Sequence, residues 1–122
     1  MDDAYFFDTY ALVEIVKANP RYARFKHSKI ALTVFNLMEF HYKVLRDFNG
    51  KIADELLSEY SQFEVPVDSQ TIREASEFKI LHRSKDLSSA DAIGYVAARR
   101  LGMKFLTGDG QFKEMPGVEF VR

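Results

Sequence analysis

The sequence predicts one α/β domain over residues 1–122, in which helices cover both faces of a parallel sheet. The chain has 122 residues, the length of one ordinary domain, and 47% of them are hydrophobic, enough for a real core. Short apolar runs alternate along it with longer segments of helical periodicity. We therefore expect a three-layer α/β/α fold around a central five-stranded parallel sheet.

Five short apolar segments are predicted to be strands of the sheet. They are residues 4–8, 29–33, 63–67, 104–107 and 118–121. Pro66 marks an end or an edge of the third strand, since proline has no backbone N–H to donate.

Five segments with apolar spacing suited to helices lie between these strands. They are residues 9–18, 34–46, 52–60, 69–82 and 88–101. Asn19-Pro20 stops the first helix, Asn49-Gly50 separates the second from the third, and Gly102 ends the last.

Composition excludes several classes of protein. The chain has no cysteine, which removes disulfides, thiol nucleophiles and Cys-ligated zinc and suits a reducing compartment. No apolar run approaches the roughly 20 residues of a membrane span, and the start at Asp2 and Asp3 is unlike a secretory signal. We expect a cytoplasmic protein with no membrane segment. Because the net charge is −1 and the pI about 6.3, any RNA must be held by a local basic patch, a metal or a second subunit.

Four acidic residues are predicted to meet at the carboxyl edge of the sheet, where ligands bind in such folds. Asp8 ends the first strand, and Asp109 follows the fourth by two residues. The helix at 88–101 leads directly into the fourth strand and must run antiparallel to it, which returns Asp91, in its first turn, to the same edge. Glu39 lies between one and two turns into the helix that follows the second strand.

Clustered carboxylates repel one another, and a hard divalent cation relieves that repulsion. Mg²⁺ and Mn²⁺ prefer oxygen ligands and also bind phosphate oxygens. The three histidines, His27, His41 and His82, share no metal-ligand spacing, so the expected ligand set is all oxygen. The chemistry that follows is hydrolysis of a phosphodiester by a metal-activated water.

The chain resembles the PIN-domain family in four blocks, which occur in the family's order and cover nearly the whole chain. The blocks are Phe-Phe-Asp8-Thr-Tyr-Ala-Leu, Asn36-Leu-Met-Glu39-Phe, Leu87-Ser-Ser-Ala-Asp91-Ala-Ile-Gly-Tyr and Phe105-Leu-Thr-Gly-Asp109-Gly-Gln-Phe. A stand-alone PIN domain of this length looks like the toxin half of a VapBC toxin–antitoxin pair.

The resemblance implies a Mg²⁺- or Mn²⁺-dependent ribonuclease in which the four acids are both metal ligands and catalytic residues, leaving a 5′-phosphate and a 3′-hydroxyl. It also implies a homodimer, for which the 11 Phe and 6 Tyr are a second argument, and a small VapB-like antitoxin. One departure concerns Gln111, where many relatives have a further acid.

Each acid also has an ordinary structural interpretation. Asp8 and Asp109 suit turns; Glu39 has the i,i+4 spacing of a surface pair with Lys43; and Asp91 completes the capping box Ser-Ser-Ala-Asp91. Capping is compatible with a site, because a helix N-terminus also favours phosphate.

Supporting roles are expected for three hydroxyls, Thr9, Ser88 and Thr107, which would orient carboxylates or waters, although caps and turns explain them nearly as well. Two groups of basic residues could bind phosphate, although the favoured interpretation is that both lie on solvated faces of the protein. They are Arg21, Arg24 and Lys26, and Lys43 and Arg46.

Two other functions were weighed. A receiver domain needs a phospho-accepting acid after its third strand, where Asp68 stands, and a lysine after its fifth, where the chain has only Arg122. It also needs paired acids after its first strand, but Asp8 is followed by Thr9. The other alternative is a catalytically inactive PIN-fold binding subunit, which the presence of all four acids disfavours.

Overall fold

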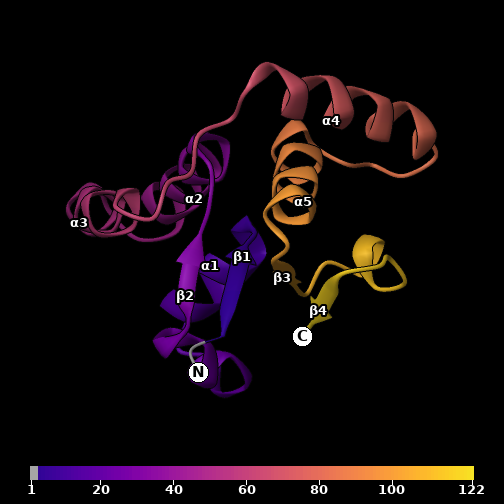
Figure 1. Cartoon of the computed structure of the whole chain (residues 1–122). Coiled ribbons are helices and arrows are strands. Elements are labelled where there is room, and N and C mark those ends of the chain that lie inside the picture. The colour runs from indigo at the N-terminus through magenta and orange to yellow at the C-terminus, as the bar shows by residue number, and fades with distance from the viewer. Residues whose placement is uncertain (1–2) are drawn as a thin grey trace.

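The computed structural model describes residues 3–122 and forms a parallel sheet between two layers of helices (Figure 1). The strands are β1 Ala4–Phe7, β2 Lys29–Ala31, β3 Lys104–Thr107 and β4 Val118–Phe120. The α-helices are α1 Thr9–Val16, α2 Val34–Asp47, α3 Gly50–Ser61, α4 Ser69–Leu81 and α5 Ser89–Leu101, and the 3-10 helices are η1 Pro20–His27 and η2 Gly110–Phe112. Asp2, part of the acidic start, lies outside the described residues. Among those described, no helix is both long and apolar enough to cross a membrane.

The sheet has the order β2-β1-β3-β4, and every neighbouring pair is parallel, as predicted. Phe6 pairs with Ala31 of β2 on one side and with Phe105 of β3 on the other. The two central strands therefore come from opposite ends of the chain. Because all strands point the same way, their carboxyl ends share one edge.

The prediction of a fifth strand over residues 63–67 is wrong. That segment contributes one isolated parallel bridge between Leu32 and Glu64, supported by a hydrogen bond of 2.8 Å from Val65 N–H to the Leu32 carbonyl. Pro66 follows at once, and without an N–H it cannot extend the ladder. Within residues 3–122 the sheet consequently has four strands, with a single bridge beyond β2.

Alternating side chains of the central strands build a core on each face of the sheet. Phe7 and Leu106 face the layer of α1, η1, α2 and α3, whereas Phe6 and Phe105 face α5. All four side chains are completely buried. This period of two confirms the three-layer arrangement and explains why β1 and β3 have apolar residues on both sides.

Most helices begin at the polar residues expected to cap them. Thr33 caps α2 and shares a capping box with Asn36. Asn49, predicted only as a break, accepts a hydrogen bond of 2.9 Å from Ile52 N–H, so α3 starts at Gly50 rather than at residue 52. The 3-10 helix η1 was not predicted, because Asn19-Pro20 reads as a stop although proline also suits the first position of a helix.

Candidate active site

The site forms at the carboxyl edge because β1 and β3 are adjacent. Phe7 pairs with Leu106, so the residues that follow the two strands meet, and the Asp8 N–H donates to the Leu106 carbonyl at 3.3 Å. The N-termini of α1 and α5 open at the same edge, since α1 follows β1 directly and α5 runs antiparallel into β3. The sequence-based argument for this edge is thus correct in its topology.

Asp8 is the most buried of the four acids, with 2% of its surface exposed. Its Oδ1 caps α1 by accepting from Ala11 N–H at 2.8 Å, and its Oδ2 accepts from the Thr107 hydroxyl. Burial raises the pKa of the Asp8 carboxyl from 3.8 to about 7; the two hydrogen bonds oppose this, and the charges of Asp91 and Asp109 add to it. An ionised Asp8 is therefore unfavourable unless positive charge is supplied nearby.

Asp91 forms the capping box that its sequence context predicted. Its N–H donates to Ser88 Oγ at 3.0 Å, and its Oδ2 accepts from Ser88 N–H at 3.0 Å. Burial raises the pKa of the Asp91 carboxyl; hydrogen bonds from Ser88 lower it, and the charges of Glu39 and Asp109 raise it. Capping therefore does not remove Asp91 from the electrostatic cluster.

Glu39 points toward the start of α1. Its Oε1 accepts a hydrogen bond of 2.7 Å from the hydroxyl of Thr9, the first residue of α1, which is 4% exposed. Among the ion pairs of residues 3–122, none joins Glu39 to Lys43. The surface-pair interpretation is thus not what the structure shows, and Glu39 is directed inward by a buried hydroxyl.

Asp109 follows β3 and is held by the turn that contains it. Its Oδ1 accepts from Gln111 N–H at 3.0 Å, and its own N–H donates to Thr107 Oγ1 at 3.0 Å. Thr107, which is fully buried, therefore contacts both Asp8 and Asp109. Each of the three hydroxyls expected to support the site, Thr9, Ser88 and Thr107, hydrogen-bonds to one of the acids or to its backbone.

The four acids act on one another electrostatically, but they do not surround a single point. In residues 3–122, no group of three or more His, Cys, Asp or Glu side chains is arranged to hold a metal ion. Each of the four carboxylates is instead engaged in a hydrogen bond: Asp8, Asp91 and Asp109 accept from backbone groups two or three residues away, and Glu39 accepts from Thr9. The donors, all oxygen and one of them buried with a raised pKa, suit Mg²⁺ or Mn²⁺ in kind. Coordination would require some of them to turn.

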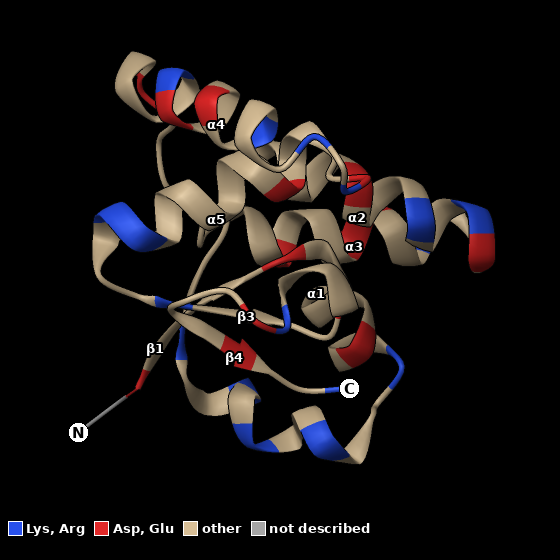
Figure 2. Ribbon diagram, turned by 90° about the vertical axis from the view of Figure 1, so that its right-hand side faces the viewer, with Lys and Arg blue, Asp and Glu red and all other residues tan. Residues whose placement is uncertain are grey.

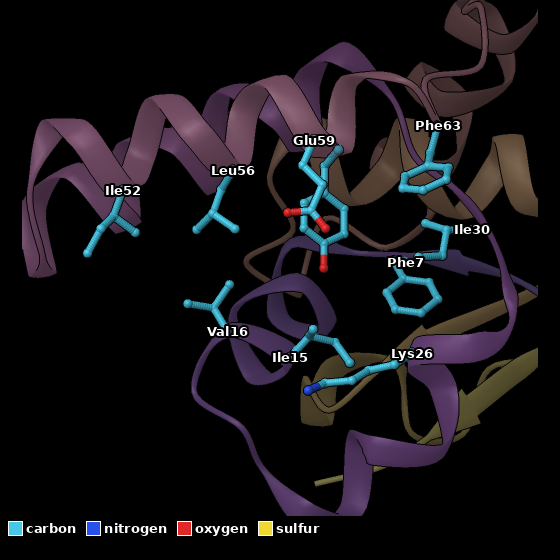
Figure 3. Close-up of a pocket in the computed structure, with 10 residues that line it drawn as sticks. Phe7, Ile15, Val16, Lys26, Ile30, Ile52, Leu56, Glu59 and Phe63 are labelled. Atoms are coloured by element: carbon cyan, nitrogen blue, oxygen red, sulfur yellow. The ribbon is translucent and has the colours of Figure 1, made fainter.

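A well-formed cavity lies elsewhere, and none of the four acids lines it (Figure 3). It has a volume of about 430 Å³ and lies among α1, η1, β2 and α3. Its walls are mostly apolar, and Lys26 and Glu59 enter it from opposite sides (Figure 3). Cavity size therefore does not identify the acidic edge.

Lys85 is absent from the residues predicted from the sequence, and Gln111 is noted there only as a departure from the family pattern. Lys85 and the side chain of Gln111 lie beside Asp109, as described below. The basic residues of η1 instead precede β2, at the opposite edge of the sheet. Arg46 is paired with Asp47 at 2.7 Å. Lys85, in the loop after α4, has no feature in the sequence beyond its charge that indicates this place.

A parallel α/β domain with acidic residues along the carboxyl edge of its sheet is the arrangement expected of a PIN domain, and the comparison with family models agrees with it. The model of the PIN domain matches residues 5–118, so the chain belongs to the PIN domain family. Its position in that family also excludes the receiver alternative. A receiver would place its third strand beside the first, whereas residue 64 bridges to Leu32, beyond β2.

Solved structures with the same fold include toxins of toxin–antitoxin pairs. The chain is similar to VapC20 of Mycobacterium tuberculosis, a sarcin-ricin loop cleaving toxin, with a TM-score of 0.81 and 19% identity, covering 94% of this chain and 97% of that one. A chain of a toxin–antitoxin complex from Klebsiella pneumoniae matches with a TM-score of 0.74 and 17% identity, and the match covers 94% of this chain and 95% of that one. A chain of DNA-bound VapBC from Salmonella typhimurium matches with a TM-score of 0.74 and 15% identity, and the match covers 99% of this chain and 98% of that one. No curated protein matches the chain by sequence.

Proposed function

We propose that this PIN domain is a Mg²⁺- or Mn²⁺-dependent ribonuclease, the VapC-like toxin of a toxin–antitoxin pair. The observation that carries the proposal is the electrostatics of the edge. Asp8 is 2% exposed and has a pKa raised to about 7, with two further acids contributing to the shift. Burying an acid beside other acids destabilises the folded protein when they are ionised, unless a bound cation compensates their negative charge. The family and its VapC neighbours supply the reaction class.

In this proposal Asp8, Glu39, Asp91 and Asp109 hold the ion or ions. A bound divalent ion would make a water more acidic and offset negative charge on the phosphate under attack. The other residues of the chain hold these acids in position. Ala11 N–H and the Thr107 hydroxyl fix the Asp8 carboxylate, and Thr9 directs Glu39. Hydrolysis would leave a 5′-phosphate and a 3′-hydroxyl.

The helix α5 assists from the opposite side of the edge. Its N-terminus, capped by Ser88, points there, and the positive end of a helix dipole favours phosphate. Asp91 therefore lies where it can contribute both to the helix start and to the ion.

The direct test is cleavage of a labelled RNA by purified protein with Mn²⁺ present or chelated. We expect cleavage only with the ion, 5′-phosphorylated products, and none from Asp8→Asn. Asp54→Asn, a matched change on the exposed surface of α3, should cut normally. Full activity in the chelator would defeat the metal mechanism. A correctly folded protein that binds RNA but never cuts would favour the inactive binding subunit.

A partner antitoxin and a homodimer belong to the same proposal. Several neighbours in fold are toxins solved with their antitoxins. For the dimer, α2 exposes an apolar stripe at helical spacing, whose members are 48–68% exposed. The stripe consists of Val34, Met38, Tyr42 and Leu45. Sedimentation of the wild type and of Met38→Glu should show a dimer and a monomer, respectively; a monomeric wild type at high concentration would contradict the dimer.

A further inference from the structure

Two lysines lie beside the acidic edge, one on α4 and one in the loop of residues 82–88 that joins α4 to α5. The Nζ of Lys85 donates to the Gln111 carbonyl at 2.7 Å, and Gln111 is two residues beyond Asp109. The Nζ of Lys79 donates to Ser89 Oγ at 3.4 Å, and Ser89 begins α5, two residues before Asp91. Each ammonium group is thus held next to the segment that carries one of the acids.

The side chain of Gln111 fixes this loop against Asp109. Its Oε1 accepts from Asp86 N–H at 2.7 Å, while its Nε2 donates to the Asp86 carbonyl at 3.3 Å and to Asp109 Oδ2 at 3.5 Å. A side-chain amide can accept from one backbone group and donate to another at the same time, whereas an ionised carboxylate can only accept. A carboxylate at position 111 would lose both donated bonds. The departure from the family pattern therefore has a structural role here, which is to hold the loop that bears Lys85.

Neither lysine is neutralised by an ion pair among residues 3–122, whereas Arg46 and Arg100 both are. Lys85 is exposed and Lys79 half-exposed, so both can reach a ligand. The one acid of the loop, Asp86, is joined to Gln111 through its backbone. Figure 2 shows basic positions on α4 and in the loop after it, at the far end of the molecule from the basic turns of η1 at the bottom of the view.

A polyanion approaching four carboxylates needs positive charge close by. The chain as a whole carries no net positive charge to attract it, since its net charge is −1, so the attraction must come from basic residues near the edge. We propose that Lys79 and Lys85 bind backbone phosphates of the RNA on the α5 side of the acidic edge, next to the phosphate that is cleaved. This inference rests on the proposed ribonuclease function and assigns two substrate subsites to it.

The experiment measures RNA binding and cleavage separately. Binding of a short fluorescein-labelled single-stranded RNA is followed by anisotropy in Mg²⁺, with Asp8→Asn as the non-cleaving parent, between about 50 and 200 mM salt. Lys79→Gln and Lys85→Gln are added singly and together. Lys104→Gln is the control, because it removes the same charge from an exposed lysine at the start of β3, the opposite edge of the sheet.

One phosphate contact on single-stranded RNA changes the salt slope of log Kd by about 0.7, or about fivefold in affinity at 0.1 M salt. The double variant should lose about 25-fold in affinity and about 1.4 in slope, while Lys104→Gln matches the parent. In the cleaving background, Lys79→Gln and Lys85→Gln should raise KM with kcat retained. Gln111→Ala, which frees the loop, should follow the loss seen for Lys85→Gln.

The outcomes separate the two proposals. Wild-type cleavage together with unchanged binding by the double variant would overturn the subsites and leave the ribonuclease standing. Lysine-dependent binding without any cleavage in Mn²⁺ would support the subsites and overturn the ribonuclease. An equal loss in Lys104→Gln would mean general electrostatic attraction and would also overturn the subsites, as would a parent that binds no RNA.

Discussion

Replacing Asp8 with asparagine tests the electrostatics of the site through folding stability, independently of any reaction. The fold holds the Asp8 carboxyl at a pKa of about 7 rather than 3.8. Keeping it ionised at pH 8 therefore costs the folded state about 4 kcal/mol relative to the unfolded chain, as an upper bound. Because the folded pKa is raised, the stability that Asp8 provides is complete below pH 3.8 and is lost as pH rises through 7.

Asparagine removes this ionisation and keeps one of the two hydrogen bonds. Its Oδ1 can still accept from Ala11 N–H, but its amide cannot accept from the Thr107 hydroxyl, which costs about 1–2 kcal/mol. The net expectation is a variant more stable than the wild type by about 2 kcal/mol near pH 8. Near pH 4 the cost of ionising Asp8 falls to about 0.6 kcal/mol, so the lost hydrogen bond dominates and the variant should be less stable by about 1 kcal/mol.

Urea unfolding in EDTA, followed by circular dichroism across this pH range, measures the difference. Glu55→Gln serves as the control, because it removes the same charge from an exposed residue of α3, whereas the neighbouring Asp54 is paired with His41. Adding Mn²⁺ near pH 8 should stabilise the wild type more than Asp8→Asn, since the ion compensates the buried charge. An Asp8→Asn effect of the same size at both ends of the pH range would refute the reasoning.

Three further substitutions test the framework around the edge, each by thermal or urea unfolding. Ser88→Ala should destabilise the fold by about 1 kcal/mol, because α5 loses its cap; an unchanged midpoint would mean that the capping box contributes nothing. Gly108→Ala should cost about 2–3 kcal/mol, because its Cβ would overlap the Tyr10 ring and lie 2.5 Å from the Val121 carbonyl oxygen. Tyr22→Phe should cost about 1 kcal/mol through loss of the 2.5 Å hydrogen bond to the same carbonyl, and wild-type stability would exclude that contribution.

Sequence patterns were enough to predict the strands and helices whose ends are marked by residues close by in the chain. The apolar runs that became β1 and β3 are bounded by Asp8 and by the Thr107 turn, and the capping box of Asp91 is written in consecutive residues. Because these signals fix both strand direction and helix direction, they also predict which edge the acids share. The same reasoning failed at residues 63–67, where a β-like composition meets Pro66 and forms a single bridge.

What could not be predicted depends on contacts between distant segments. Nothing in the spacing of Gln111 and Asp86, 25 positions apart, indicates that an amide will pair with a backbone there. Likewise, the sequence places four acids at one edge but not their oxygens, which each find a neighbouring donor in the folded chain. Positions along an edge follow from topology, whereas side-chain directions follow from packing and local hydrogen bonds.

The adjacency of β1 and β3 has a consequence for synthesis. The contact between Asp8 and Thr107 joins residues 99 positions apart, so the central strand pair can close only after residue 107 has been made. A nascent chain still lacking its last segment has Asp8 but neither Thr107 nor Asp109 to meet it. The acids of the carboxyl edge therefore come together only after residues 104–109 have left the ribosome, whichever reaction the finished edge supports.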